Sequence, residues 1–390
     1  MGAAVFLLDD TNHEESGVKD TAQGRGLVVL SKESWSDTRW ARKQWLPYWL
    51  AMMGGVRQVV YVNRHRAWWR GEKAEQDNRG CEHIDVKQFG LMLPLERCPW
   101  VRAWNRRRIG KRIASLLDDQ LDWRCLFYHP YDFQTAREIA GQATIVFDWT
   151  EDWADFHADA ALAKLQIEAI AGADAVITVT ETLQERARAI RGDEQVFLLP
   201  NATSFEPGAG GAGDETAIPE AVPHPRIAYV GHLGPWFDCD LVEALAIRRP
   251  DWSWVMVGGV SDAVRRRLGP RGNVHLLGIH VPESLPAVMR QCDVLVAPYR
   301  PEFTGDATKL YDYLTVARPI LSIPCDTARR LHACVETAVG ADEWEARIET
   351  MLGQPGINEN CLAMAGQHHW KARVETFLSM WDAMKGGRSG

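Results

Sequence analysis

Several features that would define other classes of protein are missing from this 390-residue sequence. It contains no run of about 18 apolar residues, so no membrane-spanning helix is expected. The net charge of −8 argues against general nucleic-acid binding, which requires a basic surface. Its eight cysteines show no CxxC spacing, which argues against a zinc site or a disulfide framework and favours a reducing compartment, the cytoplasm.

The first part of the chain predicts an extension followed by one α/β domain. Residues 1–25 are polar and carry no convincing helix or strand pattern, so we expect them to lie outside the fold, without a signal peptide. Within residues 26–205, short apolar and β-branched segments alternate with helical stretches. This alternation predicts parallel strands joined by crossover helices, at residues 27–30, 59–62, 125–128, 144–147, 175–179 and 196–199.

The second part of the chain repeats this organisation. Residues 206–225 are rich in glycine and proline and predict a linker, after which strands are expected at 227–230, 254–257, 274–277, 294–297 and 320–323. Residues 226–365 therefore form a second α/β domain, and residues 366–390 a last helix with a tail. We expect two doubly wound, Rossmann-like domains with a ligand in the cleft between them.

The second domain carries loops suited to a phosphate-bearing ligand. Carboxyl ends of parallel strands meet at one edge of a sheet, and glycines there let the backbone approach a phosphate closely. The residues that follow four of its predicted strands are Gly231, His232, Leu233, Gly234, Gly258, Gly278, Pro298 and Tyr299. Read together, these loops predict one site, although the Gly231–Gly234 segment alone is also compatible with a simple tight turn.

The stretch from Phe303 to Ser322 is the most informative part of this site. A polar loop leads into an amphipathic helix that carries Thr308, Lys309, Leu310 and Asp312. A helix start and the Lys309 ammonium suit a phosphate, and the Asp312 carboxylate can accept hydrogen bonds from sugar hydroxyls. The segment predicts the phosphate-and-sugar end of a nucleotide-sugar site.

Carboxylates in the first domain are candidates for acid–base chemistry. Asp148, Glu151 and Asp152 follow a predicted strand, and His129 ends the neighbouring one. A carboxylate among aromatic rings can serve as a general base for a hydroxyl, whereas the alternative is a helix cap with solvated neighbours. His129 is the rival base or a structural histidine. Neither EF-hand spacing nor a His/Cys set accompanies these residues, so no metal is expected.

Aromatic and basic residues suggest further contacts. The sequence has seventeen tryptophans, which indicate either a Trp-rich core or, for some among Trp35, Trp40, Trp45 and Trp49, an acceptor site or a membrane surface. We expect Trp35, Arg39 and Asp148 to contact the acceptor. The basic stretch 100–113 predicts either a helix lying on an anionic membrane or a solvated basic helix face.

Six motifs together give the chain a resemblance to a known family. They are residues 146–153 (VFDWTEDW), 199–201 (LPN), 231–238 (GHLGPWFD), 274–278 (VHLLG), 297–299 (APY) and 308–314 (TKLYDYL). In this order they resemble GT-B glycosyltransferases, family 4-like, of teichuronic acid and other surface-polysaccharide assembly. Two departures are present: Thr304 stands where many of these enzymes have a glutamate, and Trp236 begins the segment that replaces a usual basic pair.

The resemblance implies two Rossmann-like domains, a nucleotide-sugar held by the second, and a final helix that crosses back to the first. It assigns Lys309 to the donor phosphates, Asp312 to the ribose hydroxyls, and Glu151 or Asp152 to the position of a catalytic carboxylate. We therefore expect a metal-independent glycosyltransferase that needs no cofactor beyond its nucleotide-sugar co-substrate, acts on an acceptor hydroxyl, and works in the cytoplasm or at the inner face of an anionic membrane. The alternatives are a nucleotide-sugar epimerase of the same fold and a non-catalytic sugar-nucleotide-binding protein.

Overall fold

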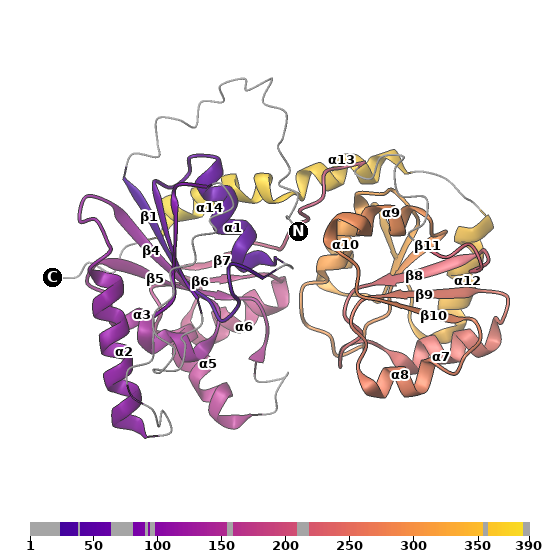
Figure 1. Cartoon of the computed structure of the whole chain (residues 1–390), viewed down its shortest axis with the longest axis horizontal. Coiled ribbons are helices and arrows are strands. Elements are labelled where there is room, and N and C mark those ends of the chain that lie inside the picture. The colour runs from indigo at the N-terminus through magenta and orange to yellow at the C-terminus, as the bar shows by residue number, and fades with distance from the viewer. Residues whose placement is uncertain are drawn as a thin grey trace, which may run out of the picture.

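A computed structural model describes residues 24–37, 40–63, 81–89, 93, 98–153, 159–208, 218–353 and 358–384 (Figure 1). It contains two parallel sheets, each flanked by helices, that lie side by side along the long axis. The expected α/β class with two Rossmann-like units is confirmed. Arg39, one of the expected acceptor contacts, lies outside the described residues.

The first sheet has seven strands in the order β3-β2-β1-β4-β5-β6-β7. All of its pairings are parallel, and every residue of β5 is buried. The strands are β1 (Arg25–Leu30), β2 (Gln58–Val62), β3 (Ile84–Lys87), β4 (Asp122–Phe127), β5 (Ala143–Trp149), β6 (Ala175–Thr178) and β7 (Val196–Leu198). The helices of this unit are α1 (Arg42–Met52), α2 (Pro99–Ala114), α3 (Phe133–Arg137), α5 (Ala160–Gly172) and α6 (Glu181–Arg191), with a 3₁₀ turn, η2, at Pro130–Asp132.

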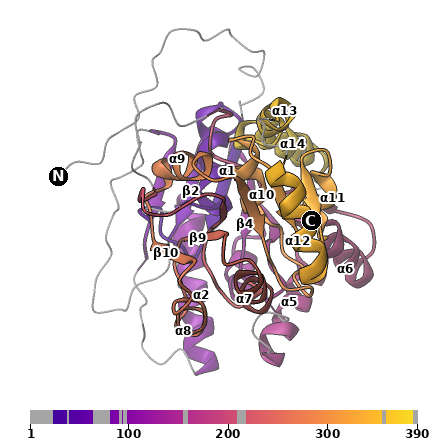
Figure 2. The same ribbon diagram turned by 90° about the vertical axis from the view of Figure 1, so that its right-hand side faces the viewer.

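The second sheet has six parallel strands in the order β10-β9-β8-β11-β12-β13. They are β8 (Arg226–Val230), β9 (Ser253–Val257), β10 (Val274–Gly278), β11 (Val294–Ala297), β12 (Ile320–Ser322) and β13 (Val335–Thr337). The helices are α7 (Cys239–Arg248), α8 (Asp262–Leu268), α9 (Leu285–Arg290), α10 (Thr308–Leu314), α11 (Asp326–Arg330) and α12 (Gly340–Gly353). Helices α9 and α10 cover one face, and α7, α8 and α12 cover the other (Figures 1 and 2).

Strand order reverses in both sheets beside the first strand of the unit, between β1 and β4 and between β8 and β11. At such a reversal the connections leave toward opposite faces, so a crevice opens at the carboxyl ends of the strands. The loops after β1 and β8 begin at Ser31 and Gly231. The topology therefore places one crevice in each unit.

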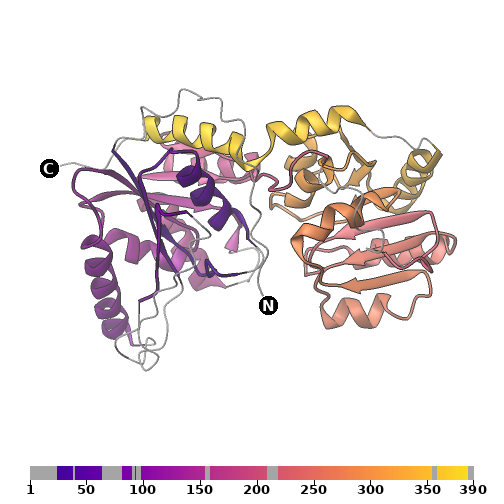
Figure 3. The same cartoon turned by 45° about the horizontal axis from the view of Figure 1, so that its top comes forward.

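The C-terminal part of the chain joins the two units. Helix α13 (Glu359–Gln367) packs on α10 of the second unit, and α14 (Trp370–Ala383) packs on α1 of the first (Figure 3). On α14, Trp370, Val374, Phe377 and Trp381 belong to the apolar core on one face of the first sheet. The burial of these four side chains fixes α14 to the first unit.

Much of the tryptophan content is structural. Among the described residues, the largest fully buried side chains include those of Trp35, Trp123, Trp149, Trp252, Trp254, Trp344 and Trp381. Each removes a large apolar surface from water and contributes to the core of one unit. The interpretation as a Trp-rich core therefore holds for these seven, including Trp35.

Candidate functional site

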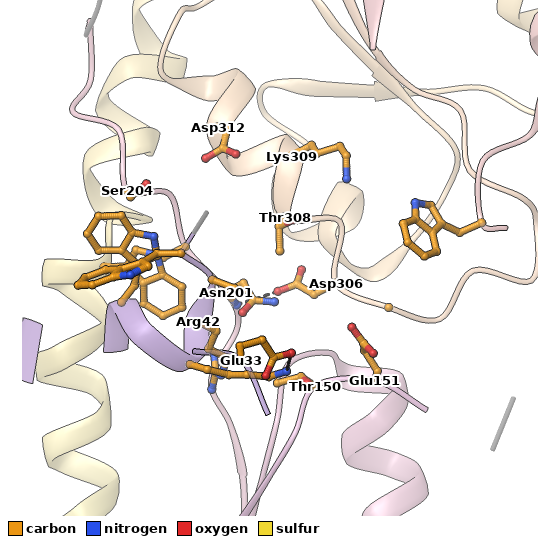
Figure 4. Close-up of a pocket in the computed structure, with 18 of the residues that line it drawn as sticks. Glu33, Arg42, Thr150, Glu151, Asn201, Ser204, Asp306, Thr308, Lys309 and Asp312 are labelled. Atoms are coloured by element: carbon orange, nitrogen blue, oxygen red, sulfur yellow. Dashed lines mark hydrogen bonds and ion pairs between the residues drawn. The ribbon is translucent and has the colours of Figure 1, made fainter. Parts of the chain in front are cut away.

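A pocket of about 400 Å³ lies between the two units. Figure 4 shows Glu33, Arg42, Thr150 and Glu151 of the first unit on one side and Asp306, Thr308, Lys309 and Asp312 of the second on the other, with Asn201 and Ser204 of the connecting segment between them. The remaining lining residues are Trp40, Ala41, Lys43, Trp45, Ala202, Trp236, Tyr299, Phe303, Gly305 and Trp370. Its volume is within the range of about 300–1,000 Å³ that is usual for small-molecule sites.

A second pocket, of about 220 Å³, adjoins the first inside the second unit. Thr308, Lys309 and Asp312, at the start of α10, line both pockets. The walls of the smaller pocket are Phe205, Val230, Gly231, His232, Val257, Gly258, Ile279, His280, Leu285, Met289 and Tyr313. A lysine and a carboxylate therefore border both a largely apolar recess in the second unit and the pocket that reaches the first unit.

Lys309 lies directly against the loop that follows β8. A Cβ atom on Gly231 would stand 1.8 Å from Lys309 Cε, and Gly231 has φ +152°, a backbone conformation that favours glycine. Lys309 Nζ lies 5.4 Å from the ring centroid of Tyr229 and 5.8 Å from that of Tyr299. Because Gly231 has no side chain, the Lys309 side chain can occupy this space and line both pockets.

Asp312 is a buried carboxylate at the junction of the two pockets. Its Oδ1 accepts a hydrogen bond of 2.7 Å from Thr203 Oγ1, in the segment that connects the units. Burial raises the pKa of Asp312 to about 7, although the Thr203 hydrogen bond and the Lys309 charge act in the opposite direction. The carboxylate therefore changes its charge near neutral pH.

Asp306 joins the two units at the floor of the larger pocket. Its Oδ2 accepts the backbone N–H of Asn201 at 2.7 Å, while Oδ1 accepts hydrogen bonds from the hydroxyls of Thr327 and Tyr311. Its side chain is fully buried. Asp306 lies three residues before Lys309, and neither Asp306 nor Glu33 was predicted as a site residue from the sequence.

Among the expected bases, Glu151 lines the pocket, and Asp152 and His129 do not. Asp152 is buried, pairs with Arg186, and accepts a hydrogen bond of 2.9 Å from Gln166. The buried His129 caps η2, because its Nδ1 accepts the backbone N–H of Tyr131 at 3.2 Å. Of the three candidates, Glu151 is therefore the one that lines the pocket, and Asp152 and His129 lie outside it.

The two described acceptor candidates lie in the interior. Asp148 is fully buried, and its Oδ2 accepts a hydrogen bond of 2.8 Å from Arg42 Nε; burial raises the pKa of Asp148 even though Arg42 opposes this. Trp35 is fully buried between Trp40 and Tyr61, with ring-centroid distances of 4.5 and 4.9 Å. The expectation that Trp35 and Asp148 contact an acceptor is therefore replaced by a structural role for both.

The predicted donor residues separate into two groups. Gly231, His232, Gly258, Tyr299, Thr308, Lys309 and Asp312 line one or both pockets. Leu233 and Leu310 are fully buried apolar side chains, and Gly234, Gly278 and Pro298 lie outside both pockets. Two of these three still shape the loops, since the Gly278 and Pro298 carbonyls accept the backbone N–H groups of Gly258 and Asp238 at 2.7 and 2.8 Å.

Two features are absent from the described residues. Within the described ranges, no three His, Cys, Asp or Glu side chains are grouped closely enough to hold a metal ion. No helix in the described part of the chain is long and apolar enough to cross a membrane.

Comparisons with known proteins give consistent matches. Residues 224–353 match the family described as glycosyl transferases group 1. The chain is 20% identical over 358 residues to a putative teichuronic acid biosynthesis glycosyltransferase, TuaH, of Bacillus subtilis (strain 168), which covers 85% of this chain and 89% of that protein.

Solved structures share the whole two-unit arrangement. Sucrose-phosphate synthase from Thermosynechococcus elongatus aligns with a TM-score of 0.71 and 14% identity, over 92% of this chain and 98% of that one. Anabaena HepE, solved in complex with UDP and glucose, aligns with a TM-score of 0.68 and 14% identity, over 93% of this chain and all of that one. At such low identity these structures establish the fold.

Proposed function

We propose that this chain, a group 1 glycosyltransferase with the GT-B fold, transfers a sugar from a nucleoside-diphosphate sugar to a hydroxyl group of an acceptor. The observation that carries the proposal is the position of Lys309 and Asp312, which line both pockets and face Glu151 across the space between the units (Figure 4). A cation, a hydroxyl-binding carboxylate and a base across one pocket are what such a transfer requires.

The second unit would hold the donor. In this proposal the apolar recess beside Ile279 and Met289 takes the nucleobase, Asp312 accepts hydrogen bonds from the ribose, and Lys309 lies against the diphosphate. Negative charge builds up on the diphosphate as its bond to the sugar breaks, so an ammonium fixed there stabilises the transition state more than the ground state. The complex of HepE with UDP supports a uridine donor as the first choice to test.

The first unit would supply the base. Glu151 takes the proton from the acceptor hydroxyl while that oxygen bonds to the anomeric carbon of the sugar. The bond from that carbon to the diphosphate oxygen breaks, and the nucleoside diphosphate leaves. Lys309 supplies the positive charge at the leaving group, so the proposed reaction uses neither a metal ion nor a cofactor.

We further propose that α2 rests on an anionic membrane at the cytoplasmic face. The helix carries six basic residues and no acidic one, while Val101, Ile109 and Ile113 face the core. Its exposed stripe consists of Trp100, Trp104, Arg107, Arg108 and Lys111. Tryptophan favours the interfacial region of a bilayer, and lysine and arginine are attracted to anionic lipids.

Cosedimentation with vesicles tests this membrane contact. The full chain should sediment with vesicles of phosphatidylglycerol and phosphatidylcholine and much less with phosphatidylcholine alone. An Arg107→Ser, Lys111→Ser double variant should lose the difference. Equal sedimentation of the wild type with both vesicles would contradict the proposal.

The proposed function is tested with the full chain, a set of UDP-, GDP- and dTDP-sugars, and candidate acceptors, with product detected by mass spectrometry. Glu151→Gln should lower kcat by about 10²–10⁴-fold because the proton acceptor is lost. Glu168→Gln, at an exposed position of α5, is the matched control and should leave kcat unchanged. Conversion of the donor sugar without nucleotide release would instead indicate an epimerase, and unchanged kcat in Glu151→Gln would exclude that residue as the base.

A further inference from the structure

The wall of the larger pocket contributed by the first unit and α14 is rich in aromatic rings. Trp40, Trp45 and Trp370 all line the pocket. The rings of Trp40 and Trp45 meet edge to face with centroids 5.0 Å apart, and the Trp40 indole N–H donates to the Trp35 carbonyl at 2.9 Å. These contacts fix the rings, so the pocket has a rigid apolar wall before anything binds.

An ion pair lines the same pocket. Lys43 Nζ lies 2.5 Å from Glu33 Oε1, and Ser31 Oγ donates to Glu33 Oε2 at 3.1 Å. Burial raises the pKa of Glu33, but the charge and hydrogen bond of Lys43 outweigh it and hold that pKa below its ordinary value. The Glu33 carboxylate therefore stays ionised, and the two side chains offer a hydrogen-bond acceptor and a donor side by side.

The loop that carries Glu33 is also fixed. The backbone N–H of Glu33 donates to Ser31 Oγ at 3.1 Å, and its carbonyl accepts the Tyr61 hydroxyl at 3.2 Å. The Glu33 side chain is still 40% exposed, whereas that of Lys43 is 13% exposed. The Glu33 carboxylate is thus held in place and is still accessible from the pocket.

The charges on this side of the pocket do not favour an anionic ligand. Two carboxylates, Glu33 and Glu151, and one ammonium, Lys43, line this side of the pocket. The positive charge of Arg42 is neutralised by the buried Asp148. A phosphate or carboxylate here would meet two like charges with only one accessible cation in the described lining of the first unit.

We propose that Glu33, Lys43, Trp40 and Trp45 form the acceptor subsite, and that it takes an uncharged pyranose ring of a saccharide. One face of a pyranose is lined by C–H groups that pack on aromatic rings, and its neighbouring hydroxyls match an adjacent carboxylate and ammonium. The inference rests on the proposed function, because it names the substrate class that would present its hydroxyl to Glu151.

Saturation-transfer NMR on the full chain tests this proposal. The probes are methyl glycosides of glucose, galactose, mannose and N-acetylglucosamine, compared with glycerol and glucose 6-phosphate. At least one methyl glycoside should receive saturation on its ring protons, and glycerol and the sugar phosphate should receive much less. Glycerol tests the need for a ring, and the phosphate tests the exclusion of charge.

Variants assign the binding to this wall. Trp45→Leu and Glu33→Gln should each weaken binding of the preferred glycoside by about tenfold. Trp49→Leu is the matched control: it lies one turn further along α1, does not line the pocket, and should bind as the wild type does. The binding measurements of the glycosides on the wild-type chain do not depend on any variant folding, so they test the proposal by themselves.

Three results would overturn the inference: no glycoside of the panel binds, glucose 6-phosphate binds better than every glycoside, or Trp45→Leu and Glu33→Gln bind as the wild type does. Thermal-shift measurements with nucleotide-sugars on the same preparation distinguish a failure of the acceptor inference from a failure of the proposed function. If nucleotide-sugars bind and saccharides do not, the acceptor inference fails alone. If nucleotide-sugars fail to bind as well, the proposed function fails with it.

Discussion

Replacing Asp312 by asparagine should stabilise the protein while it weakens donor binding. The folded state holds this carboxyl at a pKa of about 7, against an ordinary value of 3.8, chiefly because it is buried. An asparagine has nearly the same shape, can still accept the hydrogen bond from Thr203, and never carries the charge. A residue kept ionised at a cost to stability is expected where the charge serves a ligand.

The size of the effect depends on pH. A carboxyl with a raised folded pKa destabilises the fold progressively as pH rises from 3.8 to about 7, because the native state binds the proton more tightly than the unfolded chain. At about 1.4 kcal/mol for each pKa unit, the raised pKa of Asp312 lowers the free energy of unfolding by about 4 kcal/mol at pH 8, where the folded carboxyl is ionised, and by about 2 kcal/mol at pH 5, where it is protonated in the folded state and ionised in the unfolded chain. Asp312→Asn should therefore raise the free energy of unfolding by up to these amounts, and by more at pH 8.

Urea unfolding of wild type and Asp312→Asn at pH 8 and pH 5 measures this difference. Calorimetric titration with a nucleotide-sugar that binds the wild type supplies the second readout. The variant should bind between about tenfold and a hundredfold more weakly at pH 8, since hydrogen bonds to a charged group are lost. Wild-type affinity should fall about tenfold between pH 8 and pH 6 as the carboxylate is protonated, and the affinity of Asp312→Asn should stay flat over this range.

The reasoning is refuted if Asp312→Asn unfolds at lower urea than the wild type at pH 8, because burial would then not be the dominant cost. Stabilisation without any loss of donor affinity would refute the functional half alone.

Two further predictions concern close contacts. Gly231→Ala should weaken nucleotide-sugar binding at least about tenfold, because the new Cβ displaces the Lys309 side chain. Gly141→Ala is the control: it has open space around it and should bind as the wild type does. Calorimetric titration compares the two variants. Arg42→Met or Asp148→Leu alone should lower the free energy of unfolding by about 3–5 kcal/mol, because each leaves a buried charge unpaired. The double variant should recover much of that loss in urea unfolding, and additive losses would contradict the prediction.

The fold could be predicted because buried parallel strands leave continuous apolar runs in the sequence. The two strands that the prediction missed, β3 and β13, each lie at one edge of their sheet, whereas the strands at the opposite edges, β7 and β10, were predicted. Both strands are short. Buried and half-buried residues alternate along β3, and in β13 one buried residue is followed by an exposed and a half-buried one, so neither strand forms an apolar run. Edge strands have only one neighbour, and their sequence carries less of the signal.

The position of Lys309 and Asp312 in the pockets was also predictable, because both belong to one short segment at the start of α10. The interior charges were not. Asp148, Asp152 and Glu151 lie within five positions, yet the first two face partners in the interior and the third faces the pocket. Which side of the chain a carboxylate faces depends on partners 14 to 106 residues away, such as Gln166 and Arg42, and local pattern does not contain that information.

Glu33 was missed for a related reason. It follows β1 in a loop without glycine repeats, and its partner Lys43 belongs to the first turn of α1, ten residues further on. The signal that was available is its position, since a charged residue just beyond the carboxyl end of the strand at a topological switch point is a candidate for ligand contact.

The central claim is that Lys309 holds the diphosphate of a nucleotide-sugar between the two units, and calorimetric titration of wild type, Lys309→Ala and Lys164→Ala tests it most directly. Lys164 is exposed on α5 and serves as the charge-matched control. The account predicts that a nucleoside-diphosphate sugar binds the wild type and Lys164→Ala equally and binds Lys309→Ala at least about tenfold more weakly. Equal binding by Lys309→Ala would contradict it, as would a wild type that binds no UDP-, GDP- or dTDP-sugar.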